Sequence, residues 1–183
     1  MLFATNLSGT LTVSGAAAVS NSYRQVTIES FSSGITVEDN NSIGTVIPVG
    51  GSTVMPQVID ARGVTGAGVL IYDVNYADSV LHGSYQSDYV YALGSGADSL
   101  YGYGGDDTMF GYDGNDYLDG GNGNDSLSGG DGDDLMIGQA GNDVFDGGDG
   151  TDTIVYGGNR SEYEITVVNG QFQISHAGGS GAD

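Results

Sequence analysis

The chain contains no cysteine and no lysine. Without cysteine it cannot form a disulfide scaffold, a thiolate zinc site, an iron–sulfur cluster or a cysteine nucleophile. Positive charge is scarce, because 183 residues include three Lys+Arg against 24 Asp+Glu, and the formal charge is -21. This charge excludes binding of nucleic acid or anionic lipid through a basic patch, and it favours a cation as partner.

Histidine and long apolar segments are also scarce. The two histidines, His82 and His176, leave little for a histidine-based metal site or a Ser/His/Asp triad, and neither an HExxH nor a GxSxG motif occurs. No segment approaches the roughly 18 apolar residues that a membrane-spanning helix needs. We therefore expect no transmembrane segment and no intrinsic enzymatic activity.

Glycine, in contrast, is abundant, with 34 residues, and much of it belongs to a repeat of nine residues. Blocks such as GYDGNDYLD and GGDGDDLMI follow one another without insertion from Leu93 to Val155. The fourth position is always glycine: Gly96, Gly105, Gly114, Gly123, Gly132, Gly141 and Gly150. The sixth is always aspartate: Asp98, Asp107, Asp116, Asp125, Asp134, Asp143 and Asp152. The eighth is always large and apolar: Leu100, Met109, Leu118, Leu127, Met136, Phe145 and Ile154.

A tract rich in glycine and aspartate could be a disordered, self-repelling linker. The eighth position argues against that interpretation, because a linker has no reason to carry one large apolar side chain at a strict interval. Each block instead divides into a six-residue turn, GGxGxD, and a three-residue strand whose central side chain enters a core. Successive turns then lie on opposite sides, so that two blocks complete one turn of a right-handed parallel β-solenoid.

This geometry stacks the position-6 aspartates in two columns at the inter-strand spacing of about 4.8 Å. Like charges this close repel by about 1 to 4 kcal/mol at surface dielectrics, unless a cation lies between them. The available ligands are carboxylate and carbonyl oxygens, which suit Ca²⁺ better than zinc, copper or magnesium. We predict that the position-6 aspartates and position-4 glycines form about five calcium sites, and that metal binding and folding are one event.

The blocks resemble the nonapeptide GGxGxDxUx of the RTX (repeats-in-toxin) family, where U is large and apolar. The resemblance covers residues 93–155. It implies a calcium-binding β-roll, export by a type I secretion apparatus, and folding outside the cell, where calcium is abundant. The chain ends at Gly178–Asp183, a GGxGxD turn without its strand. We interpret this end as a truncation, because the family's secretion signal lies at the extreme C-terminus.

The remaining sequence predicts an all-β chain throughout. Residues 1–56 form an N-terminal β-rich segment, with strands at 10–13, 25–28, 35–37 and 45–47. Residues 57–92 resemble degenerate rungs, in which Asp78, Asp88 and Asp98 are each followed two residues later by an apolar residue. Residues 156–183 contain strands at 163–168 and 171–175 around Asn169-Gly170, which predicts a capping β-hairpin.

Two other functions remain open. The module could be a calcium-dependent adhesin or surface-layer module that binds glycans or cell surfaces, because many of its 12 tyrosines are concentrated between Tyr72 and Tyr117. Stacking of these rings between rungs explains them as well. Alternatively, the chain could be the non-catalytic C-terminal part of a secreted enzyme or toxin.

Overall fold

The computed structural model describes residues 57–64, 68–73 and 76–155, together with the strands at 2–4, 11–14, 24–28, 35–38, 43–48, 163–168 and 171–176. All the strands in these ranges belong to two sheets, and none of the described residues is helical. The strands are β1 (Leu2–Ala4), β2 (Leu11–Ser14), β3 (Arg24–Ile28), β4 (Ile35–Glu38), β5 (Ile43–Pro48), β6 (Gln57–Asp60), β7 (Leu70–Asp73), β8 (Ser79–His82), β9 (Tyr89–Ala92), β10 (Ser99–Gly104), β11 (Thr108–Asp113), β12 (Tyr117–Asn122), β13 (Ser126–Asp131), β14 (Leu135–Ala140), β15 (Asp143–Asp149), β16 (Thr153–Val155), β17 (Tyr163–Val168) and β18 (Gln171–His176).

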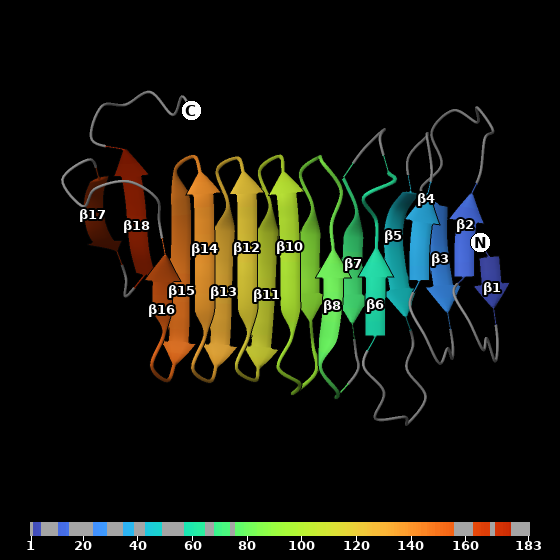
Figure 1. Ribbon diagram of the computed structural model, residues 1–183, viewed down its shortest axis with the longest axis horizontal. Helices are drawn as coiled ribbons and strands as arrows, with labels where there is room; N and C mark the ends of the chain where they lie inside the picture. Colours follow the sequence, from blue (N-terminus) through green and yellow to red (C-terminus); the bar gives the residue numbers. More distant parts are fainter. Residues whose placement is uncertain are drawn as a thin grey trace.

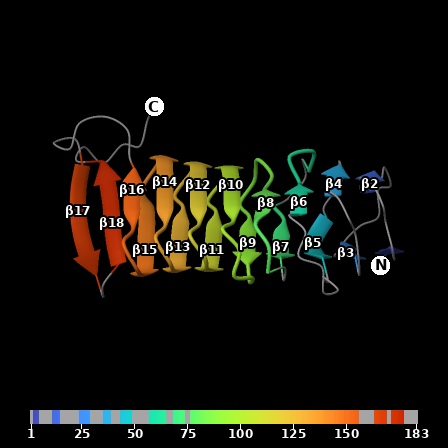
Figure 2. The same cartoon turned by 60° about the horizontal axis from the view of Figure 1, so that its bottom comes forward.

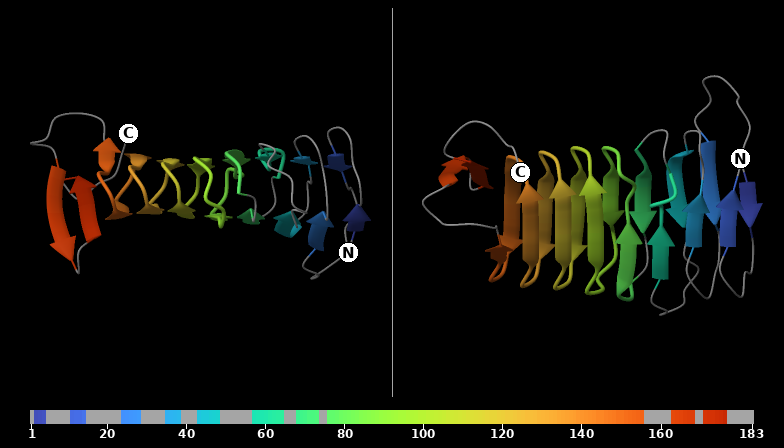
Figure 3. Two further views of the ribbon diagram at one scale, coloured as in Figure 1. Left: turned by 90° about the horizontal axis from the view of Figure 1, so that it is seen from below. Right: turned by 45° about the horizontal axis from the view of Figure 1, so that its top comes forward.

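Strands alternate between the two sheets along the chain (Figure 1). We call the ten-stranded sheet the odd sheet, since it contains the odd-numbered strands β1 to β15 and then the hairpin β18 and β17. The eight-stranded sheet is the even sheet, with the even-numbered strands β2 to β16. Pairing is parallel from β1 to β16, and Figure 3 shows the two sheets as separate layers joined by turns at both edges. The predicted all-β parallel β-roll is therefore confirmed.

Adjacent strands of one sheet lie two blocks apart in the sequence. Leu100 pairs with Leu118, and Met109 pairs with Leu127, each 18 residues further along. The position-8 side chains consequently meet inside, where those from Leu100 to Phe145 are at most 1% exposed. Ile154 packs against this cluster at the end of the even sheet. The core is thus a single file of large apolar side chains between two sheets, as the repeat predicts.

The strands are longer than the predicted three residues. β10 to β14 each have six, and they extend through the first three positions of the following block, which leaves a turn of positions 4 to 6. Glycine permits this extension, because position 1 points into the narrow interior, where no side chain fits. The prediction was wrong here because the GG pair of each block continues the strand instead of belonging to the turn.

The rungs before residue 93 follow a longer repeat than the nonapeptides. Leu100 pairs with Leu81 and Met109 with Val90, a separation of 19 residues. The predicted equivalence of Asp78 with Asp88 and Asp98 is therefore wrong, because Ser79 lies opposite Asp98 and Leu81, not Val80, enters the core. The extra residue in this rung leaves Asp78 one position before Ser79, where it is exposed and accepts from the N–H of Ala97.

The two ends of the roll differ in their pairing. The N-terminal strands β1 to β5 lie in the same two sheets as the repeat strands, in parallel pairing. At the other end, β17 and β18 form an antiparallel hairpin, and β18 pairs antiparallel with β15 (Figure 2). This hairpin covers the edge of the odd sheet, as the predicted capping hairpin does. The Asn169-Gly170 turn itself and the end at 177–183 lie outside the described residues.

Candidate calcium sites

Each position-6 aspartate is the last residue of its turn, two residues before the position-8 side chain that enters the core. The aspartates from Asp98 to Asp134 are at most 2% exposed, and Asp143 is 6% exposed. Carboxylates are seldom this buried without a compensating partner, because burial removes the hydration of the charge. The structure therefore places the predicted ligands where a compensating group is required.

One oxygen of each carboxylate joins successive rungs. The backbone N–H of Asp98 donates to Asp116 Oδ1 (2.7 Å), and the N–H of Asp116 donates to Asp134 Oδ1 (2.8 Å). On the opposite edge, the N–H of Asp107 donates to Asp125 Oδ1 (2.8 Å). The two predicted columns are therefore present. The full set of donor and acceptor pairs is Asp98–Asp116, Asp116–Asp134, Asp134–Asp152, Asp107–Asp125 and Asp125–Asp143.

The second oxygen of each carboxylate, Oδ2, is the atom that suggests a metal site. Among the position-6 aspartates, a buried Oδ2 atom without a hydrogen-bond partner occurs in Asp98, Asp107, Asp116, Asp125 and Asp134. These are the five members that have a following turn on their own edge, whereas Asp143 and Asp152 end their columns. A buried and unpaired carboxylate oxygen is costly, so each of these atoms fits a bound cation.

Main-chain carbonyls approach the same oxygens. An added Cβ on Gly102 would contact both Asp107 Oδ2 and the carbonyl oxygen of Gly120, one rung further along. Gly111 has the same relation to Asp116 Oδ2 and the Gly129 carbonyl. Gly102, Gly111 and Gly129 thus leave room at points where a carboxylate and a carbonyl oxygen converge. Together these groups form an oxygen-only cradle of the kind that Ca²⁺ prefers.

The sequence predicts the position-4 glycines as ligands. In the structure, their backbone conformation lets neighbouring turns stack. From Gly105 to Gly150, the position-4 glycines have φ between 95° and 142°, in the left-handed region that favours glycine. An added Cβ on Gly123 would fall on the Gly105 carbonyl of the preceding rung. The position-4 glycines thus allow turns to stack closely. Position 1, represented by Gly120, Gly129 and Gly147, brings its carbonyl close to an unpaired Oδ2, a role that was not predicted from the sequence. Glycine at position 1 in six of the seven blocks was the available signal.

A second ladder on the outside of the turns runs in the opposite direction. Asp106 Oδ1 accepts from the N–H of Asn124 (2.8 Å), and Asn124 Oδ1 accepts from the N–H of Asn142 (3.0 Å). On the other edge, Asn115 and Asp133 do the same for the following rungs. This bond explains why either Asn or Asp occupies position 5 in the five blocks from Asp106 to Asn142, since either side chain can accept it. These side chains hold the turns in register.

Asp88, the aspartate that precedes the nonapeptides in its column, has protein hydrogen-bond donors where the later aspartates have none. Asp88 is fully buried and lies one rung before Asp107, to whose Oδ1 its N–H donates (2.8 Å). Asp88 Oδ2 accepts from the Ser84 N–H (2.5 Å), and Asp88 Oδ1 accepts from the Ser84 hydroxyl (2.8 Å). Protein donors therefore satisfy both oxygens of Asp88, unlike those of Asp107.

No three carboxylate or imidazole side chains converge on one point within the described part of the chain. Any ion between the turns would therefore take most of its ligands from main-chain carbonyls, and this also disfavours zinc, which prefers nitrogen and sulfur ligands.

Burial changes the acidity of these aspartates when no metal is bound. It raises the pKa of Asp107 to about 8, with the Asp88 and Asp125 charges adding to the effect against the opposing backbone donor of Asp88. It raises the pKa of Asp125 to about 7, and that of Asp98 also to about 7. Protons thus compete with a cation for the same oxygens, because either one removes the unfavourable buried charge.

This competition predicts opposite pH dependences with and without calcium. Since the pKa values are raised above 3.8, the metal-free fold holds more protons than the unfolded chain, and its stability falls as the pH rises from about 4 to about 8. In chelator, we expect more β-structure by circular dichroism at about pH 5.5 than at about pH 8. Calcium affinity should instead increase with pH, because binding releases protons. A metal-free fold that becomes more stable as the pH rises would contradict this assignment.

Comparison with known families agrees with this geometry. Residues 93–127 and 128–160 match the family model of the RTX calcium-binding nonapeptide repeat. The segment from 93 to 160 therefore consists of RTX repeats, and this part of the chain is a calcium-binding RTX β-roll module. The match extends five residues beyond the predicted end of the repeats. No curated protein matches the chain.

Among the described residues, no helix is long and apolar enough to cross a bilayer.

Proposed function

We propose that this module is unfolded where calcium is scarce and folds on binding about five calcium ions after export from the cell. The five unpaired Oδ2 atoms carry this proposal, because each lies between a pair of stacked turns on one edge. Five pairs of stacked position-6 aspartates give five sites, three on one edge and two on the other. The position-6 aspartates, with main-chain carbonyls of the position-1 and position-4 glycines, would supply the ligands.

The energetics favour a switch. Each site stabilises the fold by RT ln(1 + [L]/Kd), or about 1.4 kcal/mol when calcium is ten times Kd. Five sites then contribute about 7 kcal/mol, which is comparable with the whole stability of an ordinary domain. Extracellular calcium modules bind at about 10⁻⁴ to 10⁻³ M, so the fold would form outside and not in the calcium-poor cytosol.

Type I secretion and an extracellular location are part of this proposal. They are supported by the RTX repeats, whose family is typical of secreted proteins. The net charge of -21 also favours an unfolded chain without calcium, because the acids repel one another. The module would serve as a structural, non-catalytic part of an exported enzyme, toxin or adhesin.

Calorimetric titration of the chelator-treated protein with calcium tests the proposal. We expect about five ions per chain, midpoints of about 10⁻⁴ to 10⁻³ M, and a large exothermic signal because folding accompanies binding. Binding of one ion or none, or saturation at submicromolar calcium, would overturn it.

A further inference from the structure

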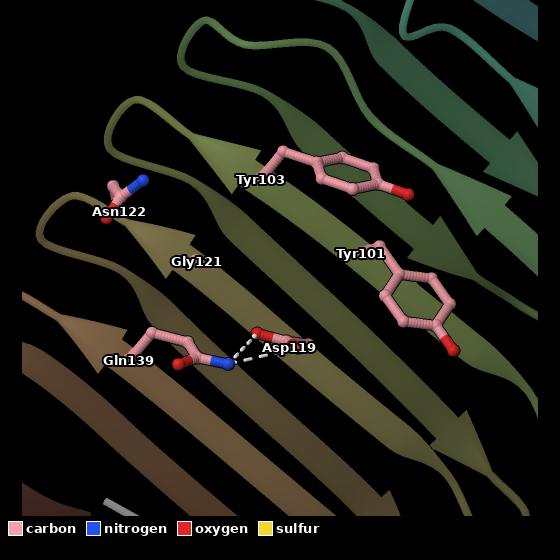
Figure 4. A pocket seen from close by; sticks show the side chains of 6 residues that line it. All are labelled: Tyr101, Tyr103, Asp119, Gly121, Asn122 and Gln139. Atoms are coloured by element: carbon pink, nitrogen blue, oxygen red, sulfur yellow. Dashed lines mark hydrogen bonds between the residues drawn. The ribbon is translucent and has the colours of Figure 1, made fainter. Parts of the chain in front are cut away.

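A hollow of about 230 Å³ lies on the outer face of the even sheet and reaches the turn edge at Asn122, the last residue of β12. It spans three neighbouring rungs, on β10, β12 and β14. Figure 4 shows the Tyr101 and Tyr103 rings on one side of Gly121, Gln139 on the other, and Asp119 further along the same strand as Gly121. The remaining lining residue is Asn122. None of these side chains has a part in the calcium sites.

The register explains the hollow. Tyr103, Gly121 and Gln139 occupy position 2 of three rungs that lie side by side, since Tyr103 pairs with Gly121 and Gly121 pairs with Gln139. The central member lacks a side chain, so it forms a floor between two walls. The column two residues earlier places Tyr101 beside Asp119. Tyr103 and Gln139 are two rung spacings apart, or about 9.6 Å, whereas Tyr101 and Asp119 are neighbours one spacing apart.

Two of the wall residues occupy a backbone conformation that favours glycine. Tyr103 has φ 74° and Gln139 has φ 68°, as Tyr112 has φ 71° at the same block position on the odd sheet. A side chain in this left-handed region costs about 1 to 2 kcal/mol. On the even sheet the two strained residues flank Gly121, whereas on the odd sheet Tyr112 is followed by Gly130 and Gly148. The even sheet is therefore the one on which two such side chains enclose a space.

The tyrosine wall is held in place by its neighbours. The Tyr103 hydroxyl is 2.8 Å from His82 Nδ1, and the Arg62 guanidinium lies 5.9 Å from the centre of the Tyr103 ring. The Tyr101 ring stacks on His82, with centroids 5.0 Å apart. The rings are therefore fixed before any ligand arrives, which lowers the entropy cost of binding.

The polar wall is also oriented, although its bonds are long. Gln139 Nε2 donates to both oxygens of Asp119 at 3.2 and 3.3 Å, and the Tyr117 hydroxyl donates to Asp119 Oδ2 at 3.3 Å. Long bonds leave the carboxylate and the amide able to form shorter ones with a ligand. A carboxylate and an amide side by side can accept from and donate to adjacent hydroxyl groups.

From this arrangement we propose that the hollow is a binding site for a neutral saccharide. Sugar hydroxyls would pair with Asp119 and Gln139, and the apolar C–H face of the ring would pack on the wall formed by Tyr101 and Tyr103. Asp119 and the net charge of -21 disfavour an anionic ligand. The site requires the folded roll but not the export role, so the two proposals can fail separately.

The odd sheet provides a matched control surface. Tyr91 occupies position 9 there, as Tyr101 does on the even sheet, and it stacks between Tyr72 and Phe110 with centroids 4.8 and 5.1 Å apart. In the rungs that follow it, position 2 carries Tyr112, which has φ 71°, and then Gly130 and Gly148. The described part of the odd sheet therefore has the aromatic ladder but no amide among these position-2 residues.

Saturation-transfer NMR of the calcium-loaded protein with maltohexaose, cellohexaose and laminarihexaose, followed by calorimetry, tests the site. We expect millimolar or tighter binding of at least one glucan, and no binding of polygalacturonate. Gln139→Gly should lower the affinity about tenfold while the melting temperature rises, because the strain is relieved and one hydrogen-bonding group is lost. Tyr101→Ala should also lower the affinity about tenfold, and Tyr91→Ala should leave it unchanged.

Three results would overturn the proposal. The first is the absence of transfer to all three glucans by folded, calcium-loaded protein. The second is equal weakening by Tyr91→Ala and Tyr101→Ala, which would indicate a general effect of aromatic loss. The third is unchanged affinity in Gln139→Gly, which would place any binding elsewhere.

Discussion

Asp125→Asn should weaken calcium binding at two sites at once and stabilise the metal-free fold. Asparagine keeps an oxygen for the Asp107 N–H, which donates to Asp125 Oδ1 at 2.8 Å, but it removes the charge at the unpaired Oδ2. Asp125 lies between a turn on each side, at Asp107 and at Asp143, so both neighbouring ions lose a charged ligand. We expect the midpoint of the calcium titration to rise about tenfold or more.

The opposite effect without calcium follows from the buried charge. The pKa of Asp125 is raised to about 7 by burial, so its charged form destabilises the metal-free fold at about pH 8. Asparagine carries no such charge, so in chelator at about pH 8 the variant should show more β-structure by circular dichroism than the parent. If Asp125→Asn binds calcium with unchanged stoichiometry and midpoint, the stacked-site geometry is wrong.

Asp106→Asn is the matched control, because it removes the same charge one residue from Asp107 on the same edge. Asp106 is exposed, and its Oδ1 accepts the N–H of Asn124 at 2.8 Å, a bond that asparagine can also accept. Asparagine already occupies this block position at Asn115, Asn124 and Asn142. The calcium midpoint of this variant should stay within about twofold of the parent.

Gly102→Ala should remove one calcium site and destabilise the calcium-loaded fold. The added Cβ would fall on Asp107 Oδ2 and next to the Gly120 carbonyl, the two oxygens that face the same cradle. Either the oxygens or the strands must move, at about 2 to 3 kcal/mol, and the ion between these turns loses its place. Calorimetry should show one ion fewer, and the calcium-loaded protein should melt at a lower temperature.

Gly104→Ala tests whether that loss comes from the cradle. Gly104 lies two residues along β10 on the same face, but an added Cβ there meets nothing closer than the Asn122 carbonyl oxygen at 3.7 Å. Its effect on stability should stay within about 0.5 kcal/mol. Equal losses at both glycines would mean that the strand needs glycine for a reason unrelated to calcium.

The sequence could predict those features that depend on a strict period. Position 8 repeats without exception, and a core that is one side chain deep between two sheets follows from it. The same period predicts two aspartate columns, because two blocks complete a turn of the roll. The predicted hairpin strand at 163–168 and β17 coincide, since alternating apolar residues flank an Asn-Gly turn.

Other features depend on contacts between rungs, which a linear pattern does not encode. The Gly120 carbonyl oxygen approaches Asp107 Oδ2 only because of the offset between neighbouring rungs. The extension of the strands through position 2 depends on the same offset, which the sequence does not give. The closure of Asp88 by Ser84 depends on a rung one residue longer than the nonapeptide pair, and the ten-residue spacing of Asp78, Asp88 and Asp98 concealed this. The hollow over Gly121 depends on which position-2 residues become neighbours 18 residues apart.

The coupling of calcium to folding is tested most directly by far-ultraviolet circular dichroism of the chelator-treated protein at about pH 8, titrated with calcium and separately with magnesium. The buried, unpaired carboxylate oxygens predict a disordered spectrum without metal. They also predict a cooperative gain of β signal with calcium, little change with magnesium, and full reversal by EDTA. A β spectrum that is already complete in chelator and unchanged by calcium would contradict the account.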